Sequence, residues 1–425
     1  VVLQGCQPLV PAGTILEIWP VTVTEPASAQ LRSIEELFLP APVVQLLHNY
    51  ESLFQPPTTL PPSRFCDHSI PLIEGARPVS IRPYRLSPAM KDEIESQVAE
   101  MLQTGLIQHS TSAFSSPVLL VKKKDNSWHF CVDYRHLNAL TVKSKYPVPI
   151  IDELLDELFG ASWFSILDLR AGFHQILLKQ GEAHKTAFQT HMGHYEFRVM
   201  AFGLTGAPGT FQKAMNHTLS PLLRKCALVF FDDILVYSGS LDDHINHLQQ
   251  VFQLLAQDTW KVKLSKCKFA QQQVSYLGHV VSAQGVSTDP MKIQAIATWP
   301  EPSCLKELRS FLGLAGYYRK FIRHFGVICQ PLTALLKKGA LFVWTSDHAV
   351  AFRTLQTALS QSPVLALPDF AATFFIETDA SAVGVGAVLM QKGHPLAFLS
   401  KALGPKSRGL STYEKGYLAV ILVVQ

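Results

Sequence analysis

The chain has 425 residues, is 48% hydrophobic and carries a formal net charge of +4. This length allows two or three domains with cores of their own, and the absence of any run of 18 apolar residues excludes a membrane-spanning helix. The seven cysteines are scattered without C-x-x-C spacing, which favours reduced intracellular thiols over a disulfide framework or a zinc site.

The charge is divided unevenly along the chain. Residues 1–116 hold 6 Lys/Arg and 11 Asp/Glu, a net charge of −5, whereas residues 117–425 hold 31 and 22, a net charge of +9. A polyanionic partner is therefore expected on the second part. The sequence starts without Met and shows no signal-peptide pattern, so we expect a fragment of an intracellular, cytoplasmic protein.

The N-terminal region is Pro-rich and weakly patterned. It predicts one helix near 33–50, followed by a linker, "QPPTTLPPSR". A helix with clear ends comes next: Ser87 is a suitable N-cap, Pro88 suits the first helical position, and Gly105 ends the apolar period.

Strands and helices then interleave. Residues 115–138 predict two strands joined by a charged turn, and 206–223 predict a helix. Residues 274–286 predict a hairpin around Gly278, and 374–401 predict strands with Gly turns. Between them, 305–325 predicts a basic, aromatic-rich helical stretch. The mixture indicates α+β domains.

Two adjacent acids interrupt an apolar segment, "ALVFFDDILVYS". Asp232 and Asp233 could simply mark a tight turn, because Asp favours turn geometry. A second pair, Asp242 and Asp243, follows Ser240 at the predicted start of an amphipathic helix, where acids are common, and needs no chemistry. The first pair therefore needs a companion elsewhere before it indicates a site.

Asp168 is that companion, since it also ends an apolar strand, "WFSILD". Three carboxylates brought to one sheet would repel one another and raise each other's pKa unless a cation neutralised them. Oxygen ligands favour Mg²⁺ or Mn²⁺, and two such ions about 4 Å apart suit in-line phosphoryl transfer. The pattern predicts a metal-dependent phosphoryl transferase.

The ordered motifs "LDLRAGFHQI", "FGLTGAPGTFQ", "FFDDIL" and "YLGHVV" resemble reverse transcriptases of gypsy-class LTR retrotransposons, plant members in particular. The resemblance implies a right-hand polymerase: 1–63 as the region linking protease to polymerase, 64–285 as fingers and palm, 286–368 as thumb, and 369–425 as a partial RNase H domain of α/β type. It also implies an RNA template, a DNA or RNA primer and dNTP as partners, and a virus-like particle as the cytoplasmic setting.

The resemblance also assigns residues. Asp168, Asp232 and Asp233 match the catalytic, metal-binding triad. The residues expected to contact the incoming nucleotide are Lys123, His129, Phe173, Phe202 and Gly203, with Phe173 as the gate for the sugar 2′-hydroxyl. The residues that match the primer-grip hairpin are Leu277, Gly278 and His279.

Two departures from the family pattern indicate decay. His129 stands where the family has an Arg that contacts the triphosphate, and a neutral imidazole cannot replace a bidentate contact. Asp379 matches the first RNase H carboxylate, but "YEKGY" places Gly416 where the next acid is expected. We therefore expect no RNase H activity. Two hypotheses remain for the whole chain: it is an RNA-directed DNA polymerase, or it is a nucleic-acid-binding remnant that no longer catalyses.

Overall fold

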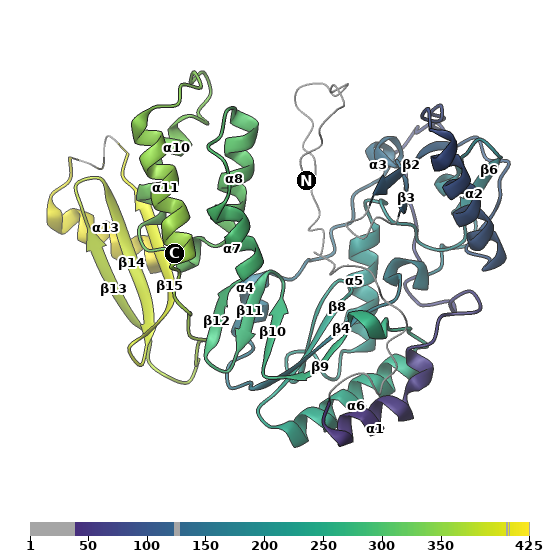
Figure 1. The fold of residues 1–425 in the computed structure, drawn as a ribbon, viewed down its shortest axis with the longest axis horizontal. Helices are drawn as coiled ribbons and strands as arrows, with labels where there is room; N and C mark the ends of the chain where they lie inside the picture. Colours follow the sequence, from purple (N-terminus) through teal and green to yellow (C-terminus); the bar gives the residue numbers. More distant parts are fainter. Residues whose placement is uncertain (1–38, 123–127, 405–406, 408, 425) are drawn as a thin grey trace.

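The computed structural model describes residues 39–122, 128–404, 407 and 409–424. Figure 1 shows a five-stranded sheet with its helices at one end, a central sheet in the middle, and a helical unit with a further small sheet at the other end. The charged turn predicted after Lys122 lies outside the described residues.

The first part of the chain forms a five-stranded sheet and the helices around it. Its strand order is β1-β6-β5-β2-β3, and only the β2–β5 pair is parallel. The strands are β1 (Ile107–His109), β2 (Ser116–Lys122), β3 (Trp128–Val132), β5 (Phe188–Gln189) and β6 (His194–Phe197). Helices α2 (Pro88–Gln103) and α3 (Arg135–Leu140) lie beside this sheet. Helix α1 (Ala41–Asn49) instead packs against α6 (Leu241–Gln257), and α4 (Ile151–Asp156) buries Leu155 in a separate core. As predicted, Ser87 caps α2, because its hydroxyl accepts the Met90 N–H.

The central sheet is antiparallel, in the order β7-β8-β4-β9. Its strands are β4 (Trp163–Asp168), β7 (Ala227–Phe230), β8 (Asp233–Ser238) and β9 (Lys268–Gln271). Helices α5 (Ala207–Thr218) and α6 (Leu241–Gln257) pack against it, and Ser240 caps α6 as predicted.

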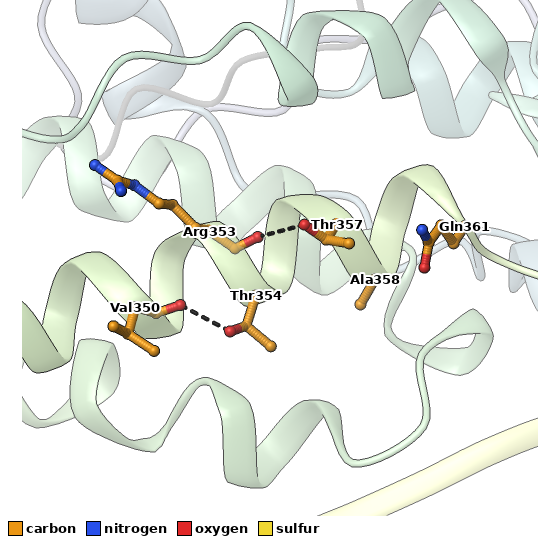
Figure 2. Close-up of a pocket in the computed structure, with 6 residues that line it drawn as sticks. All are labelled: Val350, Arg353, Thr354, Thr357, Ala358 and Gln361. Carbon is orange, nitrogen blue, oxygen red and sulfur yellow. Dashed lines mark hydrogen bonds between the residues drawn. The ribbon is translucent and has the colours of Figure 1, made fainter.

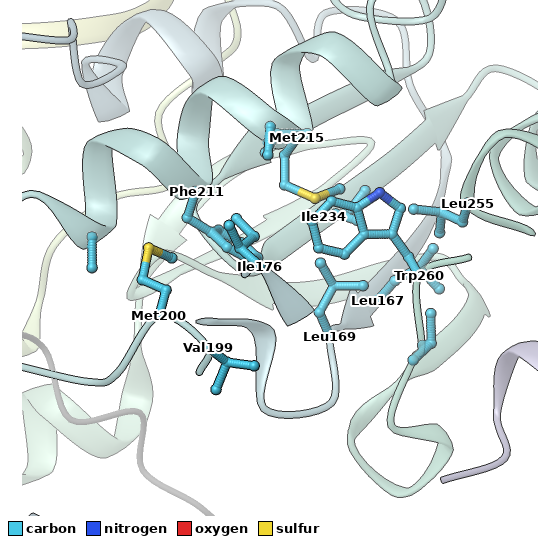
Figure 3. Close-up of a cluster of buried hydrophobic side chains, with 14 of the residues drawn as sticks. Leu167, Leu169, Ile176, Val199, Met200, Phe211, Met215, Ile234, Leu255 and Trp260 are labelled. Atoms are coloured by element: carbon cyan, nitrogen blue, oxygen red, sulfur yellow. The ribbon is translucent and has the colours of Figure 1, made fainter. Parts of the chain in front are cut away.

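A large apolar core lies between this sheet and α5, and Trp260 is its largest side chain (Figure 3). The Trp260 ring N–H donates to Thr218 Oγ1 at 3.0 Å, and the Arg64 guanidinium lies 3.7 Å from the ring centroid. On α5, Phe211 and Met215 are fully buried, as the helical spacing predicts. This core supports the ends of β4 and β8.

The helical unit follows a three-stranded antiparallel sheet of β10 (Gln273–Tyr276), β11 (His279–Ser282) and β12 (Gly285–Thr288). Its helices are α7 (Pro290–Ala297), α8 (Leu305–Tyr317), α9 (Phe325–Ile328), α10 (Gln330–Ala334) and α11 (Ser346–Ser360). The predicted helical stretch 305–325 is broken: α8 ends at Tyr317, and a short 3₁₀ turn, η6, covers Arg319–Phe321. The break buries Tyr318, Phe321 and Ile322 in one core.

The C-terminal sheet is antiparallel and contains β13 (Phe375–Ala380), β14 (Gly384–Gln391) and β15 (His394–Ala402), packed against α13 (Thr412–Val424). This sheet is in close contact with the helical unit at Gly326. The Gly326 N–H donates to Ser400 Oγ at 2.7 Å, and a Cβ on Gly326 would lie 2.6 Å from the Ser400 carbonyl oxygen. Nor is there space for a Cβ at Gly384, because Val327 would lie 2.3 Å away.

Within the described ranges, no helix is both long and apolar enough to cross a membrane.

Candidate active site

The three predicted carboxylates lie together at one end of the central sheet. Asp168 ends β4 and is the cross-strand partner of Asp233, the first residue of β8. Phe230 pairs with Asp233, so Phe231 and Asp232 form a two-residue turn between β7 and β8. The fold therefore brings the predicted companion beside the acid pair.

These acids strongly perturb one another. Burial, and then the charges of Asp232 and Asp168, raise the pKa of Asp233 to about 7. Burial also raises the pKa of Asp168, while the nearby Lys266 acts in the opposite direction. The end of the sheet is thus a site of concentrated negative charge that favours a cation.

Lys266 provides one such cation. Its Nζ lies 3.1 Å from Asp168 Oδ2, and the Asp168 side chain is only 14% exposed. The lysine comes from a 3₁₀ turn, η5 (Leu264–Lys266), which is held next to β4 because the Lys263 N–H donates to the Asp168 carbonyl at 2.8 Å. Sequence reasoning did not pair Lys266 with Asp168, which lies 98 positions away along the chain.

The donor chemistry fits a divalent metal. Carboxylate oxygens are the ligands that Mg²⁺ and Mn²⁺ prefer, and the charge density around Asp233 is what such an ion would neutralise. As they stand, no three His, Cys, Asp or Glu side chains of the described residues converge closely enough to hold an ion. Asp168 would have to exchange its lysine partner for the ion.

Gln212 fixes the turn that carries Asp232. Phe231 has a left-handed backbone, with φ +53°, and its N–H donates to Gln212 Oε1 at 2.8 Å. The Gln212 amide group in turn donates to the Val229 carbonyl at 3.2 Å and to Asn216 Oδ1 at 2.8 Å. Sequence reasoning missed this role, although a Gln next to Phe211 on α5 was a detectable signal.

Tyr276 is a second residue that sequence reasoning missed. Its hydroxyl is buried and makes no hydrogen bond within the described part of the chain. Burial, and then the charge of Asp233, raise the pKa of this phenol. A neutral donor therefore stands near the carboxylates.

Four of the predicted nucleotide contacts also gather. The rings of Phe173 and Phe202 are stacked, with centroids 4.8 Å apart, and His129 lies 6.2 Å from Phe202. Gly203, with φ +90°, follows in a tight turn whose carbonyl accepts the Asn138 side chain at 2.8 Å.

Gly172 brings this cluster close to the acids. A Cβ at this glycine would lie 2.8 Å from Phe211 and 3.5 Å from Asp232 Cβ, so the loop carrying Phe173 can approach the turn only without a side chain there.

The predicted grip hairpin is a two-residue turn. Leu277 and Gly278 have φ +46° and +73° between the paired Tyr276 and His279, as in a type I′ turn. His279 is buried, and its Nδ1–H donates to the Leu277 carbonyl at 3.1 Å.

Comparison with known proteins decides the family of the central region. Residues 121–281 match the model described as "Reverse transcriptase (RNA-dependent DNA polymerase)", and 344–425 match "RNase H-like domain found in reverse transcriptase". Residues 121–281 belong to the reverse transcriptase family.

Relatives extend this result over most of the chain. The Retrovirus-related Pol polyprotein from transposon 297 of Drosophila melanogaster is 42% identical over 350 residues, 81% of this chain and 33% of that protein. The gypsy Pol polyprotein of the same organism is 36% identical, over 81% of this chain and 35% of that protein. The Tf2-3 polyprotein of Schizosaccharomyces pombe is 33% identical, over 85% and 27%.

The chain thus spans about a third of the length of these relatives. It is similar over most of its length to one part of retrotransposon Pol polyproteins, among them that of gypsy.

Solved structures confirm the predicted fold class. The foamy viral protease–reverse transcriptase, solved in complex with double-stranded DNA, has a TM-score of 0.84 at 22% identity and covers 92% of this chain and 70% of that one. The same viral protein with an RNA/DNA hybrid gives 0.79 at 23%, covering 92% and 54%. The α+β reverse transcriptase fold with an RNase H-like domain is therefore shown, while the predicted boundaries at 63, 285 and 368 remain predictions.

The other two predicted site residues to be placed are Lys123 and Asp379. Lys123 falls outside the described residues. Asp379 lies on the exposed strand β13 of the RNase H-like sheet, opposite Gly386. Gly416 lies in α13, and nothing is within 4 Å of the place where its Cβ would be.

A shallow hollow on the helical unit is separate from the acids. It lies along one face of α11 and is lined by Val350, Arg353, Thr354, Thr357, Ala358 and Gln361 (Figure 2). Its two threonine hydroxyls already donate to carbonyls of the preceding helical turn, so the hollow offers little for recognition.

Proposed function

We propose that this chain is an RNA-directed DNA polymerase that adds a deoxynucleotide to a primer 3′-hydroxyl. The observation that carries the proposal is the cross-strand pairing of Asp168 with Asp233, with Asp232 in the adjoining turn. Membership of the reverse transcriptase family supports the same reaction.

In the proposed reaction the primer 3′-oxygen forms a bond to the α-phosphorus of the dNTP. The bond to pyrophosphate breaks, and the hydroxyl proton leaves for the solvent. Asp168, Asp232 and Asp233 would hold Mg²⁺ or Mn²⁺, which when bound supplies charge neutralisation and acidifies the hydroxyl.

The remaining predicted residues orient the substrates. The Phe173 ring, supported by the stacked Phe202, excludes a 2′-hydroxyl, and the turn at Gly203 lets the backbone approach the nucleotide closely. Lys123 and His129 contact the triphosphate. Leu277, Gly278 and His279 hold the primer strand.

The proposed partners are an RNA template, a DNA or RNA primer and dNTP. The structures of the related foamy viral protein contain double-stranded DNA or an RNA/DNA hybrid, and residues 117–425 of this chain carry a net charge of +9. We place the protein with the plant members of the family, inside a cytoplasmic virus-like particle.

A second candidate function is a binding remnant without catalysis, which two residues favour. His129 replaces an expected Arg, and Gly416 replaces an expected RNase H acid. We propose that RNase H activity is absent, with Asp379 as the remnant of that site.

Primer extension on an RNA template, with Mg²⁺ and with Mn²⁺, tests the polymerase proposal. The parent chain should extend the primer, and Asp232→Asn should abolish extension while the circular dichroism spectrum is unchanged. Asp242→Asn, in the acid pair at the start of α6, is the matched control and should extend normally. Template–primer binding without extension by the parent chain would favour the remnant, and full activity of Asp232→Asn would overturn the assigned site.

A further inference from the structure

Lys292 lies against the Leu277–Gly278 turn. It is in the first turn of α7, whose N-cap Asp289 accepts the Met291 N–H at 2.9 Å. Its Nζ is 5.4 Å from the centroid of the Tyr317 ring, and a Cβ on Gly278 would lie 2.5 Å from it. A Cβ at position 278 would push the ammonium group away from this place.

Two consecutive tyrosines hold the turn itself. The Tyr317 hydroxyl donates to the Leu277 carbonyl, and the Tyr318 hydroxyl donates to the Gly278 carbonyl at 2.6 Å. Both carbonyls of the turn are therefore bound by the end of α8. Tyr317 has a double role, since its ring faces Lys292 while its hydroxyl fixes the backbone.

The two lysines near this turn differ in their partners. Lys320, the other nearby lysine, is paired with Asp152 at 2.6 Å. Burial, with the charges of these two lysines, lowers the pKa of His279 to about 4, so the imidazole is neutral at physiological pH. Among the residues that the structure describes, no carboxylate forms an ion pair with Lys292.

An ammonium held on an aromatic ring, beside a fixed glycine turn, suits a phosphodiester group. The ring and the turn restrict the lysine before any ligand arrives, which lowers the entropy cost of binding.

We propose that Lys292 binds one backbone phosphate of the bound nucleic-acid duplex, and that Tyr317 and Tyr318 position the turn and the lysine for it. This inference rests on the proposed function, because it assigns a contact to the duplex on which the polymerase acts. It adds a cation from the helical unit to the predicted grip residues.

Equilibrium binding of a fluorescent template–primer over a KCl series tests the contact. Loss of one phosphate contact should reduce the slope of log affinity against log salt by about one. Lys292→Gln should therefore weaken binding roughly 10-fold at low salt, with a shallower slope. The control Lys225→Gln removes an exposed lysine near the opposite end of β7 from Asp232 and should change neither value.

Two tyrosine variants separate the ring from the hydroxyl. Tyr317→Phe keeps the ring, so the salt slope should stay at the parent value. Tyr317→Leu removes the ring and should reduce the slope as Lys292→Gln does, with no further loss in the double variant. Equal slopes for the parent chain, Lys292→Gln and Tyr317→Leu would overturn the proposal.

Neutral methylphosphonate linkages, placed singly in the primer or in the template, identify the strand. A neutral linkage at the contacted phosphate should lower the affinity of the parent chain. It should not lower the affinity of Lys292→Gln further, because that variant already lacks the contact. If the losses of affinity from Lys292→Gln and from the neutral linkage were fully additive at every linkage, the proposed contact would be wrong. The assay uses no dNTP, so a chain that binds as expected but never extends would refute only the polymerase function.

Discussion

The main-chain N–H of Phe231 donates a hydrogen bond to Gln212 Oε1 at 2.8 Å, which ties helix α5 to the turn that carries Asp232. A left-handed backbone is unfavourable for a side chain as large as Phe, by about 1–2 kcal/mol. Gln212 is buried and makes three hydrogen bonds in this region, so its amide holds a turn that would otherwise relax.

We predict that Gln212→Leu lowers kcat for primer extension by about 10- to 100-fold, because small displacements of reacting groups have effects of that size. The KM for dNTP should change little. Steady-state kinetics check the prediction. Asn216→Ala removes the distal partner of Gln212 and a bond to Tyr146 but leaves the Phe231 bond in place, so kcat should stay within about threefold of the parent value. Equal loss in both variants would contradict a specific role for the Phe231 hydrogen bond.

Phe173→Ala should increase ribonucleotide incorporation relative to deoxyribonucleotide. The ring is the proposed obstacle to a 2′-hydroxyl, and Phe202 stacks on it at 4.8 Å. Because the Phe202 ring supports Phe173, Phe202→Ala should also increase ribonucleotide incorporation, but to a smaller extent. Extension with matched dNTP and rNTP measures the ratio, and an unchanged ratio in Phe173→Ala would count against the gate.

His129→Arg should raise kcat/KM for dNTP if position 129 contacts the triphosphate. A charged contact worth roughly 1.5–3 kcal/mol corresponds to about a 10- to 150-fold effect. Steady-state kinetics with dNTP decide the matter, and identical kcat/KM values for the two proteins would show that position 129 does not contact the triphosphate.

His244 should make the central sheet sensitive to acid. The ring is fully buried between Ser165 Oγ at 2.7 Å and Ser238 Oγ at 3.0 Å, and burial lowers its pKa to about 4. An unfolded histidine binds a proton near pH 6.5, so this neutral ring contributes stability above that pH and loses it as the pH falls toward 4.

Lowering the pH from 7 to 5 should therefore reduce the free energy of unfolding by about 2 kcal/mol through this residue alone. Urea denaturation of the parent chain and of His244→Gln, each at the two pH values, measures the contribution. The variant should be less stable at pH 7 and should lose about 2 kcal/mol less on acidification. An equal loss in both proteins would assign the acid sensitivity to other groups.

Local signals predicted much of the architecture. Ser87 and Ser240 cap helices where the sequence indicates, and the hairpin at Gly278 forms where a tight turn was expected. Asp168 and Asp232 lie far apart in the sequence, but both were predicted as site residues because each ends or interrupts an apolar strand. These features were predictable because each depends on only a few neighbouring residues, and periodicity and turn chemistry act over that distance.

Features made by tertiary contact were not predictable in this way. Lys266 reaches Asp168 across 98 positions of sequence, and Tyr318 reaches Gly278 across 40. Helix α8 stops at Tyr317, short of the apolar and basic pattern that continues to 325, because the following aromatic residues turn into the core. None of these contacts has a signature in local spacing.

The glycine contacts between α9 and the C-terminal sheet have a mechanical consequence. Where Gly326 meets Ser400 and Gly384 meets Val327, neither glycine has a side chain that could bend to accommodate sliding between the two units. A swing of the helices over a bound duplex would consequently carry the RNase H-like sheet with it as a single lever. The RNase H-like sheet would then add mass and leverage to that motion.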